Sequence, residues 1–278
     1  MSLDFSFPFA RKILAAVYRE GSFYRIPFGP LRGLQFHYDS KMTAHAVLGI
    51  QDLNFFSLAT ALFEKLGWTD SKEFSAFDLG ANRGLYSLYL SKYFGKVYAF
   101  EPNPVVFEIL DQNCKKNHLL NVETVPKAVT EKKGTLELCI GDEDHTGFLK
   151  GAQRPQSSFK SQQVATISLD AFAEEKAILP VRFIKIDIEG AGIWALDGAK
   201  KLIETHRPVI YFESHSPEED KSLGDLLLKN NYKAFRVTNS QWVEDASKTH
   251  PSKEGVWGNC LVIPNEYMDA AHAVLKSA

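Results

Sequence analysis

Two segments near residues 80 and 100 constrain the fold of this 278-residue chain more than any others. Phe74–Leu79 is mostly apolar and leads into a turn of small residues, and a second apolar run ends on an acid in Lys96–Glu101. This order predicts a buried strand, a turn that opens a helix, and a second strand that ends on a carboxylate. The layout is typical of a nucleoside-binding crevice in a doubly wound sheet, where the carboxylate after the second strand binds ribose hydroxyls.

The turn itself indicates the kind of nucleoside. Its form is Gly80-x-Asn82-x-Gly84, which differs from the G-x-G-x-x-G of dinucleotide enzymes, and Asp78 stands two residues ahead of its first glycine. Glycine and asparagine tolerate left-handed backbone and let a ligand approach closely. The following helix N-terminus attracts a carboxylate, and Asp78 can receive an ammonium group directly or through water. Because S-adenosylmethionine joins a nucleoside to an amino acid, it fits this pattern.

The composition is that of an ordinary globular protein, with 45% hydrophobic and 24% charged residues. Its 32 basic and 34 acidic side chains create no net field for a polyanion, so nucleic acid is not expected as a partner, although a local basic patch stays open. Neither a run of about 20 apolar residues nor a secretory signal is apparent. Three scattered cysteines favour buried thiols over zinc or disulfides. We therefore expect a cytoplasmic protein without a membrane span.

Strand and helix patterns alternate from residue 74 onward. The expected strands are Phe74–Leu79, Lys96–Glu101, Asn121–Val125, Val181–Ile186, Pro208–Glu213, Lys233–Val237 and Gly258–Ile263. The expected helices are Gly84–Tyr93, a segment capped by Asn103, Gly192–Thr205, Glu218–Asn230 and a segment from Asn265. The alternation predicts an α/β fold, with a doubly wound, mostly parallel seven-stranded sheet and helices on both faces. The last two strands lack a crossover helix, which suggests an antiparallel hairpin at one edge.

An aromatic-rich N-terminal region precedes this pattern. We expect residues 1–70 to form an extension or lid over the acceptor pocket, with helices at Ala10–Arg19 and Asn54–Leu66, and residues 71–278 to form the main domain. Simple core packing explains the aromatic rings equally well.

The sequence also departs from the strand–helix alternation after the third expected strand. Gly134–Ile140 and Gln163–Leu169 have the pattern of antiparallel strands, and the polar stretch Gly141–Gln162 between them is expected to be a long functional or mobile loop. Ala128 is expected to line the adenine pocket, and Asp142 to contact adenine from this loop.

Four expected parallel strands end in acidic or polar groups, which is the main functional argument. Ligands in open α/β sheets bind beyond the carboxyl ends of the strands. The groups are Asp78, Glu101, Asp187 with Glu189, and Glu213 with His215.

The later two pairs carry the candidate chemistry. Asp187 and Glu189 share one face if their strand continues, and they can orient a hydroxyl, act as a general base or help to hold a divalent cation. Lys185 lies either at a sheet edge or paired with one of these acids. His215, with an unperturbed pKa of about 6.5, suits proton removal from an alcohol, although a lone histidine is more often structural.

These residues resemble the FkbM family of S-adenosylmethionine-dependent methyltransferases over roughly half of the chain, in separate blocks. The blocks are Asp-Leu-Gly-Ala-Asn-Arg-Gly (78–84), Ala-Phe-Glu-Pro-Asn-Pro (99–104), Ser-Leu-Asp (168–170), Lys-Ile-Asp-Ile-Glu-Gly-Ala (185–191) and Arg-Pro-Val-Ile-Tyr-Phe-Glu (207–213). The first two indicate only a class I methyltransferase, whereas the fourth is a family hallmark. The resemblance implies a seven-stranded sheet with an antiparallel last strand, and methyl transfer to a hydroxyl of a sugar or natural-product scaffold.

The chain departs from the family pattern at Gly192, where the family usually has a glutamate. A role of that acid in positioning substrate or ordering the helix start would then be lost. This motivates an alternative function, a protein that binds S-adenosylmethionine without transferring its methyl group. A dinucleotide oxidoreductase is a third alternative that the glycine pattern disfavours.

Our sequence-based assignment is an O-methyltransferase that acts on a small-molecule or glycan acceptor. The candidate cofactor-binding residues are Asp78, Gly80, Asn82, Gly84, Glu101, Pro102, Asn103, Ala128 and Asp142. The candidate catalytic residues near the acceptor are Asp187, Glu189, Glu213 and His215. These ligand types are compatible with a divalent metal, but none is predicted.

Overall fold

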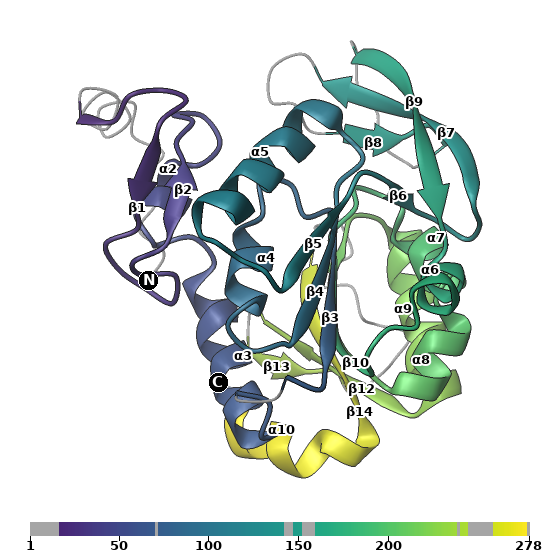
Figure 1. Cartoon of the computed structure of the whole chain (residues 1–278). Coiled ribbons are helices and arrows are strands. Elements are labelled where there is room, and N and C mark those ends of the chain that lie inside the picture. Colours follow the sequence, from purple (N-terminus) through teal and green to yellow (C-terminus); the bar gives the residue numbers. More distant parts are fainter. Residues whose placement is uncertain are drawn as a thin grey trace.

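A mixed eight-stranded sheet forms the centre of the molecule (Figure 1). The computed structural model describes residues 17–69, 72–141, 147–151, 159–237, 240–243 and 258–276. Within these ranges the strand order is β13 (Gln241–Trp242), β12 (Tyr232–Arg236), β14 (Gly258–Pro264), β11 (Val209–Ser214), β10 (Val181–Ile186), β3 (Ser75–Leu79), β4 (Lys96–Phe100) and β5 (Val122–Val125). Because β3, β4, β5, β10 and β11 pair in parallel, their carboxyl ends meet at one edge.

The expected mostly parallel sheet is present, with one difference. The two-residue strand β13 adds an eighth strand beside β12, where the sequence predicted seven. The expected antiparallel pairing of the last two predicted strands at one edge is confirmed, because β14 pairs antiparallel with β12 at the end of the sheet that β13 extends. A strand of two residues is too short to leave a periodic signal in the sequence.

Helices cover both faces of the sheet (Figure 1). One layer consists of α3 (Leu53–Lys65), α4 (Leu85–Leu90), α5 (Pro104–Lys116) and α10 (Met268–Val274), and the other of α6 (Leu169–Lys176), α7 (Gly192–Asp197), α8 (Lys200–His206) and α9 (Pro217–Asn230). Successive residues of a strand point to opposite faces, so Phe183 packs in the first layer and Ile184 in the second. Burial on both faces explains why the apolar residues of β10 and β11 do not simply alternate with polar ones.

A smaller sheet covers one end of the crevice. It contains β6 (Ala128–Val129), β9 (Phe159–Ile167), β7 (Gly134–Gly141) and β8 (Gly147–Leu149), and β7 pairs antiparallel with β9 as expected. The expected uninterrupted loop Gly141–Gln162 is wrong in part, because β8 lies within it and β9 already begins at Phe159.

The helices differ from expectation in three places. The expected helix Gly192–Thr205 is broken into α7 and α8 at Gly198, where a Cβ atom would overlap the carbonyl oxygen of Thr130. Helix α6 was not predicted, although Ser168 caps it by accepting a hydrogen bond from Ala171 N–H at 3.3 Å. The C-terminal helix begins with a 3₁₀ turn, η2 (Asn265–Tyr267).

The N-terminal region packs on the first helical layer. It contributes the hairpin β1 (Phe23–Arg25) and β2 (Gln35–His37), the short helix α2 (Ala44–Val47), and α3, whose Phe55 and Phe63 lie in the same core as the sheet. The expected helix Ala10–Arg19 lies mostly outside the described residues.

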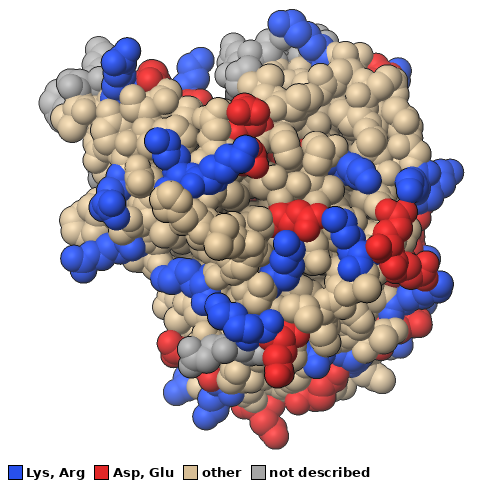
Figure 2. Space-filling model, viewed as in Figure 1, with Lys and Arg blue, Asp and Glu red and all other residues tan. Residues whose placement is uncertain are grey.

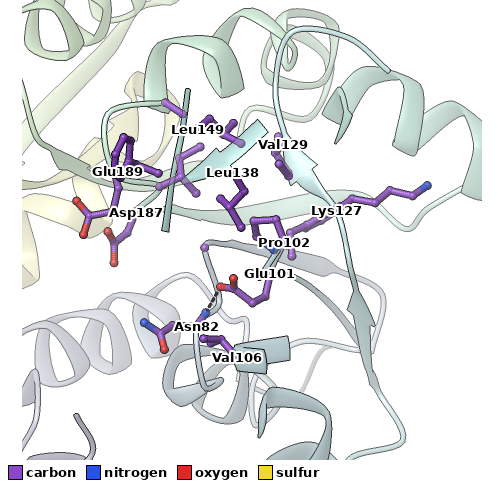
Figure 3. Close-up of a pocket in the computed structure, with 16 residues that line it drawn as sticks. Asn82, Glu101, Pro102, Val106, Lys127, Val129, Leu138, Leu149, Asp187 and Glu189 are labelled. Atoms are coloured by element: carbon purple, nitrogen blue, oxygen red, sulfur yellow. Dashed lines mark hydrogen bonds between the residues drawn. The ribbon is translucent and has the colours of Figure 1, made fainter. Parts of the chain in front are cut away.

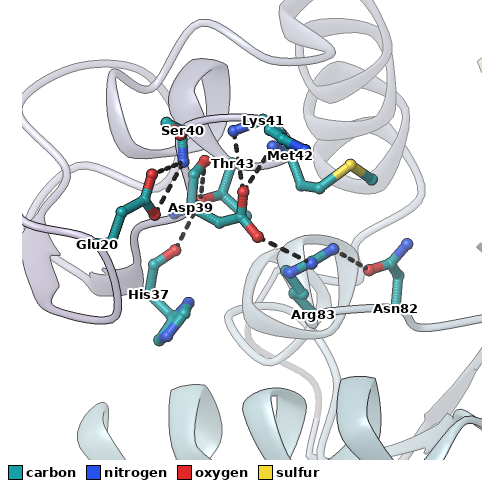
Figure 4. Close-up of polar contacts among 9 residues, drawn as sticks. All are labelled: Glu20, His37, Asp39, Ser40, Lys41, Met42, Thr43, Asn82 and Arg83. Carbon is teal, nitrogen blue, oxygen red and sulfur yellow. Dashed lines mark hydrogen bonds and ion pairs between the residues drawn. The ribbon is translucent and has the colours of Figure 1, made fainter. Parts of the chain in front are cut away.

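Polar contacts attach this region to the main sheet (Figure 4). Asp39 accepts hydrogen bonds from the N–H groups of Lys41 and Met42 and forms an ion pair with Arg83, at 3.2 Å. The Arg83 side chain, 5% exposed, also donates to the Asn82 side chain at 3.2 Å. The turn of residues 80–84 is therefore tied directly to the N-terminal region.

The surface carries both signs of charge. On the face in Figure 2, basic and acidic side chains are interspersed. No helix in the described part of the chain is long and apolar enough to cross a membrane. Cys114, Cys139 and Cys260 are free and buried, as expected.

Candidate active site

A cavity of about 740 Å³, part of it open to solvent, lies at the carboxyl ends of β3, β4 and β10 (Figure 3). Of the predicted cofactor-binding residues, Gly80, Asn82, Glu101, Pro102 and Ala128 line it. Apolar side chains from the smaller sheet and α5 complete the wall, including Val106, Leu138 and Leu149. We call this space the donor cavity. Its mainly apolar wall with a few polar groups is typical of a cofactor site.

Glu101 is the polar anchor of the donor cavity. Its two carboxylate oxygens accept hydrogen bonds from Asn103 N–H at 2.9 Å and from Asn82 N–H at 3.0 Å. Burial raises the pKa of Glu101 to about 7, against the opposing effect of these two N–H groups. Each oxygen keeps a second lone pair, so the carboxylate can also accept two hydroxyl groups of a ligand.

The turn before α4 approaches other backbone closely. Gly80 has φ +71°, and a Cβ atom there would overlap the carbonyl oxygen of Asp187. Asn82 also has a positive φ, 49°. These conformations match the prediction that residues 80 and 82 need left-handed backbone.

Of the other four predicted cofactor residues, three do not line the donor cavity, and one lies outside the described residues. Gly84 has a φ of +89° and lies against α5, where its Cβ would be 2.6 Å from Leu110 Cδ1, so backbone conformation and helix packing explain this glycine. Asn103 is buried and caps α5 by accepting a hydrogen bond from Val105 N–H at 3.1 Å. Asp142 lies outside the described residues. Asp78 is the fourth.

Asp78 is fully buried beneath the turn. Its carboxylate accepts a hydrogen bond from Ser87 Oγ at 2.6 Å and lies 3.5 Å from Lys185 Nζ. Direct reception of a ligand ammonium by Asp78 is therefore not supported by this geometry. Asp78 instead holds Lys185 in place.

Lys185 contacts both the turn after β3 and the carboxylate that follows β10. Its Nζ donates to the Gly80 carbonyl at 2.8 Å and lies 3.3 Å from Asp187 Oδ2 and 5.1 Å from the centre of the Tyr86 ring. Burial lowers the pKa of Lys185, but the charges of Asp187 and Asp78 outweigh it and raise the pKa above its usual value. Of the two alternatives for this lysine, pairing with acids is the one observed.

A second cavity of about 900 Å³ lies on the other side of the turn. It shares Gly80, Asn82 and Asp187 with the donor cavity, and the N-terminal region supplies part of its wall. We call it the acceptor cavity. Its lining includes Phe36, Met42, Gln51, Asp52, Arg83, Tyr86, Lys185, Glu213 and Asn259.

The four predicted catalytic residues come together beside this cavity. His215 Nε2 lies 3.5 Å from Asp187, 3.6 Å from Glu189 and 3.8 Å from Glu213, in each case to a carboxylate oxygen. Asp187 and Glu189 were expected to share one face of a continued strand. This expectation is wrong, because β10 ends at Ile186 and Glu189 has a φ of 31°. A turn, and not a continued strand, brings Asp187 and Glu189 to the same imidazole. We call these four residues the acid–histidine cluster.

The surroundings of Glu213 and His215 shift the pKa values of these two residues differently. Burial and the charge of Asp187 raise the pKa of Glu213 to about 7, with His215 opposing them. Burial lowers the pKa of His215, but Glu219, Asp187, Glu189 and Glu213 together raise it to about 9. Near neutral pH this makes His215 a cation and Glu213 the group poised to accept a proton. The sequence allowed a carboxylate or His215 as the base, and the structure favours the carboxylate of Glu213.

Three cluster residues also have ligand types that metals accept. Asp187, Glu213 and His215 each offer one atom, and these atoms lie within 4.8 Å of one another. Lys185 and the imidazole of His215 already supply positive charge next to the carboxylates. Chemically, the arrangement is therefore suited to accepting and donating protons.

Sequence reasoning missed Glu219, which enters the cluster from α9. Its carboxylate accepts hydrogen bonds from Gly192 N–H at 2.7 Å and His215 N–H at 2.6 Å. The expected loss of order at the helix start is thus not observed, because Glu219 satisfies the first N–H of α7. The available signal was the Ser216-x-x-Glu219 pattern at a helix start, which predicts a capping acid.

The chain belongs to the FkbM methyltransferase family. The sequence model of the methyltransferase FkbM domain matches residues 78–237, which include β4, β10, β11 and the acid–histidine cluster. The predicted family is confirmed, and with it membership of the methyltransferases.

Two characterised relatives share part of the sequence. Methyltransferase sdnD of Sordaria araneosa is 39% identical over 201 residues, covering 60% of this chain and 76% of sdnD. Hexuronic acid methyltransferase AglP of Haloferax volcanii is 26% identical over 153 residues, covering 54% of this chain and 60% of AglP.

Solved structures of methyltransferases also align with the chain. An FkbM methyltransferase from Methylobacillus flagellatus has a TM-score of 0.41 at 17% identity, covering 69% of this chain and 43% of its own. The methyltransferase domain of METTL16 has a TM-score of 0.48 at 12% identity, covering 84% of this chain and 73% of its own.

Proposed function

We propose that this protein is an S-adenosylmethionine-dependent O-methyltransferase that acts on a hydroxyl group of a small sugar-like or natural-product acceptor. The observation that carries the proposal is the meeting of two cavities at Gly80, Asn82 and Asp187. One cavity contains Glu101, suited to ribose hydroxyls, and the other contains Glu213, suited to accept a proton.

Several further observations support the donor. Family membership supports S-adenosylmethionine, and Glu101 has lone pairs available for both ribose hydroxyls. Pro102 and Ala128, with apolar neighbours, line the space expected for adenine. The methionine part would extend past Gly80 and Asn82 toward Asp187, where the cavities meet.

The chemistry requires little from the protein beyond alignment and proton removal. A sulfonium donor supplies an activated methyl group when bound. An acceptor oxygen held in line forms the new C–O bond as the C–S bond breaks, and alignment of this kind contributes about 7–11 kcal/mol. The hydroxyl proton passes to Glu213, while Asp187 and Glu189 hold His215 and the acceptor.

The nature of the acceptor is proposed on three grounds. The acceptor cavity is lined by carboxylates, a buried lysine and tyrosine, which suit a polyhydroxylated compound. The relatives named for methyl transfer include a hexuronic acid methyltransferase. The balance of charges gives no support for a nucleic acid acceptor. The free buried thiols support a cytoplasmic location within the same proposal.

The test is product formation. The protein is incubated with S-adenosylmethionine and a panel of monosaccharides, glycosides and hydroxylated aromatic compounds, and S-adenosylhomocysteine is measured. Multiple turnovers with at least one hydroxyl acceptor, and a methyl ether in its product, are expected. Tight donor binding with no turnover on any acceptor would instead support the alternative of a non-transferring binding protein.

A further inference from the structure

Glu219 is a buried carboxylate that stands behind the acid–histidine cluster. It is fully buried, lies on the first turn of α9, and accepts hydrogen bonds from two backbone N–H groups that belong to different segments, Gly192 at the start of α7 and His215 after β11. Its Oε2 also lies 3.6 Å from His215 Nδ1. A fully buried carboxylate is costly unless such partners compensate it, so its place at this junction requires an explanation.

Helix capping accounts for only part of the arrangement. Ser216 Oγ accepts a hydrogen bond from Glu219 N–H at 3.2 Å, which is half of a capping box. In a complete box the glutamate would return to the N–H of Ser216 itself. Here the carboxylate goes instead to the residue before the cap and to Gly192, outside its own helix.

The space for this carboxylate depends on the absence of a side chain at residue 192. A Cβ atom on Gly192 would lie 2.7 Å from Glu219 Oε1 and 2.7 Å from Phe212 Cζ. Gly192 has no left-handed φ, so backbone conformation does not require a glycine there. The glycine leaves room for the carboxylate to enter from α9.

We propose that Glu219 is a positioning residue, which fixes the imidazole of His215 between its own carboxylate at Nδ1 and the cluster carboxylates at Nε2. Both ring nitrogens then face acceptors, which favours the doubly protonated imidazolium. A cation at this point holds Glu213 ionised, ready to accept the acceptor's proton. The link to catalysis rests on the proposed function, but the positioning of His215 does not.

Four carboxylates face this imidazole from every element packed against it. They are Asp187 and Glu189 after β10, Glu213 in β11 and Glu219 in α9. Lys185, the nearby cation, is engaged with Asp187 and Asp78. Among the four, Glu219 is the one at Nδ1, so neutralising it removes the partner of one ring nitrogen without altering the donor or acceptor cavity.

The experiment is a titration of His215 by two-dimensional ¹H–¹⁵N NMR on the full chain labelled at histidine, with the signal assigned by its loss in His215→Asn. In Glu219→Gln the pKa of His215 should fall by at least about one pH unit relative to wild type. Glu218→Gln, which removes an exposed acid from the same turn, should leave it unchanged. Ser216→Ala, which removes only the helix cap, should lower thermal stability and also leave the pKa unchanged.

An unchanged His215 pKa in folded Glu219→Gln, or an equal fall in Ser216→Ala, would overturn the proposal. If Glu219→Gln does not fold, Glu219→Asp withdraws the carboxylate by one methylene and should lower the pKa by about half a unit or more; no change there counts equally against the proposal. The titration needs neither donor nor acceptor. Its failure is therefore distinct from failure of methyl transfer, which the product assay reports.

Discussion

The donor and acceptor halves of the site are built in different ways. The polar anchor of the donor half is local, because Glu101 is held by the N–H groups of Asn103 and Asn82, which follow two strands that are neighbours in sequence and in the sheet. The acceptor half gathers its side chains from β10, β11 and α9, and its cavity wall from the N-terminal region. A short stretch of sequence therefore specifies the polar anchor that we propose for the donor, whereas the proposed reaction depends on long-range assembly.

This difference implies that the two halves can be disabled separately. The donor half uses backbone donors, which no single side-chain change outside the turn removes. The acceptor half depends on mutual charge compensation among the cluster residues and Lys185. Substitutions in the cluster should alter turnover and its pH dependence while donor binding stays intact.

The largest expected effect comes from Glu213→Gln. Loss of the proton acceptor should lower kcat by about 10²–10³-fold, the usual contribution of a general base. The dissociation constant for S-adenosylmethionine should stay within about twofold, because Glu213 does not line the donor cavity. Steady-state kinetics and calorimetry provide the two measurements.

A fall in donor affinity as large as the fall in kcat would contradict the claim that donor binding and turnover depend on separate parts of the site. Such a result would show that donor binding and turnover depend on the same interactions. Glu218→Gln serves as the matched control, since it removes the same charge from an exposed position.

The pH dependence of kcat/KM is the next largest effect. The pKa of Glu213 is raised to about 7, so below that pH the carboxyl is protonated and cannot accept a proton. The rate should then fall about tenfold for each pH unit below the pKa. Above pH 7 the rate should level, and it should decline again as His215 loses its charge near its pKa of about 9. A rate independent of pH between 5 and 7 would exclude Glu213 as the base.

A smaller effect is expected at the contact between the N-terminal region and the turn. Asp39→Asn keeps an oxygen for the N–H groups of Lys41 and Met42 but removes the charge that pairs with Arg83. We expect the acceptor KM to rise by about threefold to fivefold, the magnitude of a partly exposed ion pair of about 1 kcal/mol. Donor affinity should not change, and a selective loss of donor binding would place Arg83 in the donor half instead.

The smallest expected effect is that of a chelator. Because Lys185 and His215 compensate the cluster carboxylates, turnover should be unchanged after dialysis against EDTA. Activity that is lost on chelation and restored by Mg²⁺ or Mn²⁺ would reassign Asp187, Glu213 and His215 as a metal site.

The sequence was sufficient for most of the fold because the deciding signals were local. Alternating apolar runs specified the main strands, and Asn103 followed by Pro104 specified the start of α5. Features that depend on tertiary contacts were missed. The break between α7 and α8 follows from the close approach of Gly198 to Thr130, and the strand β13 is too short to show periodicity.

The same distinction holds for the site. Gly80, Asn82 and Glu101 were predicted from a spacing that the structure preserves, and they line the donor cavity. Asp78 was predicted to contact the ligand. Its carboxylate lies below the turn instead, where it accepts a hydrogen bond from Ser87 and pairs with Lys185. Glu219 could not be linked to the cluster from sequence alone, because its partner Gly192 lies on another helix.

The most direct test of the separate construction of the two halves is calorimetric titration of S-adenosylmethionine into wild type, Glu101→Ala and Glu213→Gln. We expect micromolar binding to wild type and Glu213→Gln, and binding at least tenfold weaker in Glu101→Ala, which corresponds to about 1.4 kcal/mol. Equal affinity in wild type and Glu101→Ala, or no binding to wild type, would contradict the assignment of the donor cavity and with it the proposed methyl transfer.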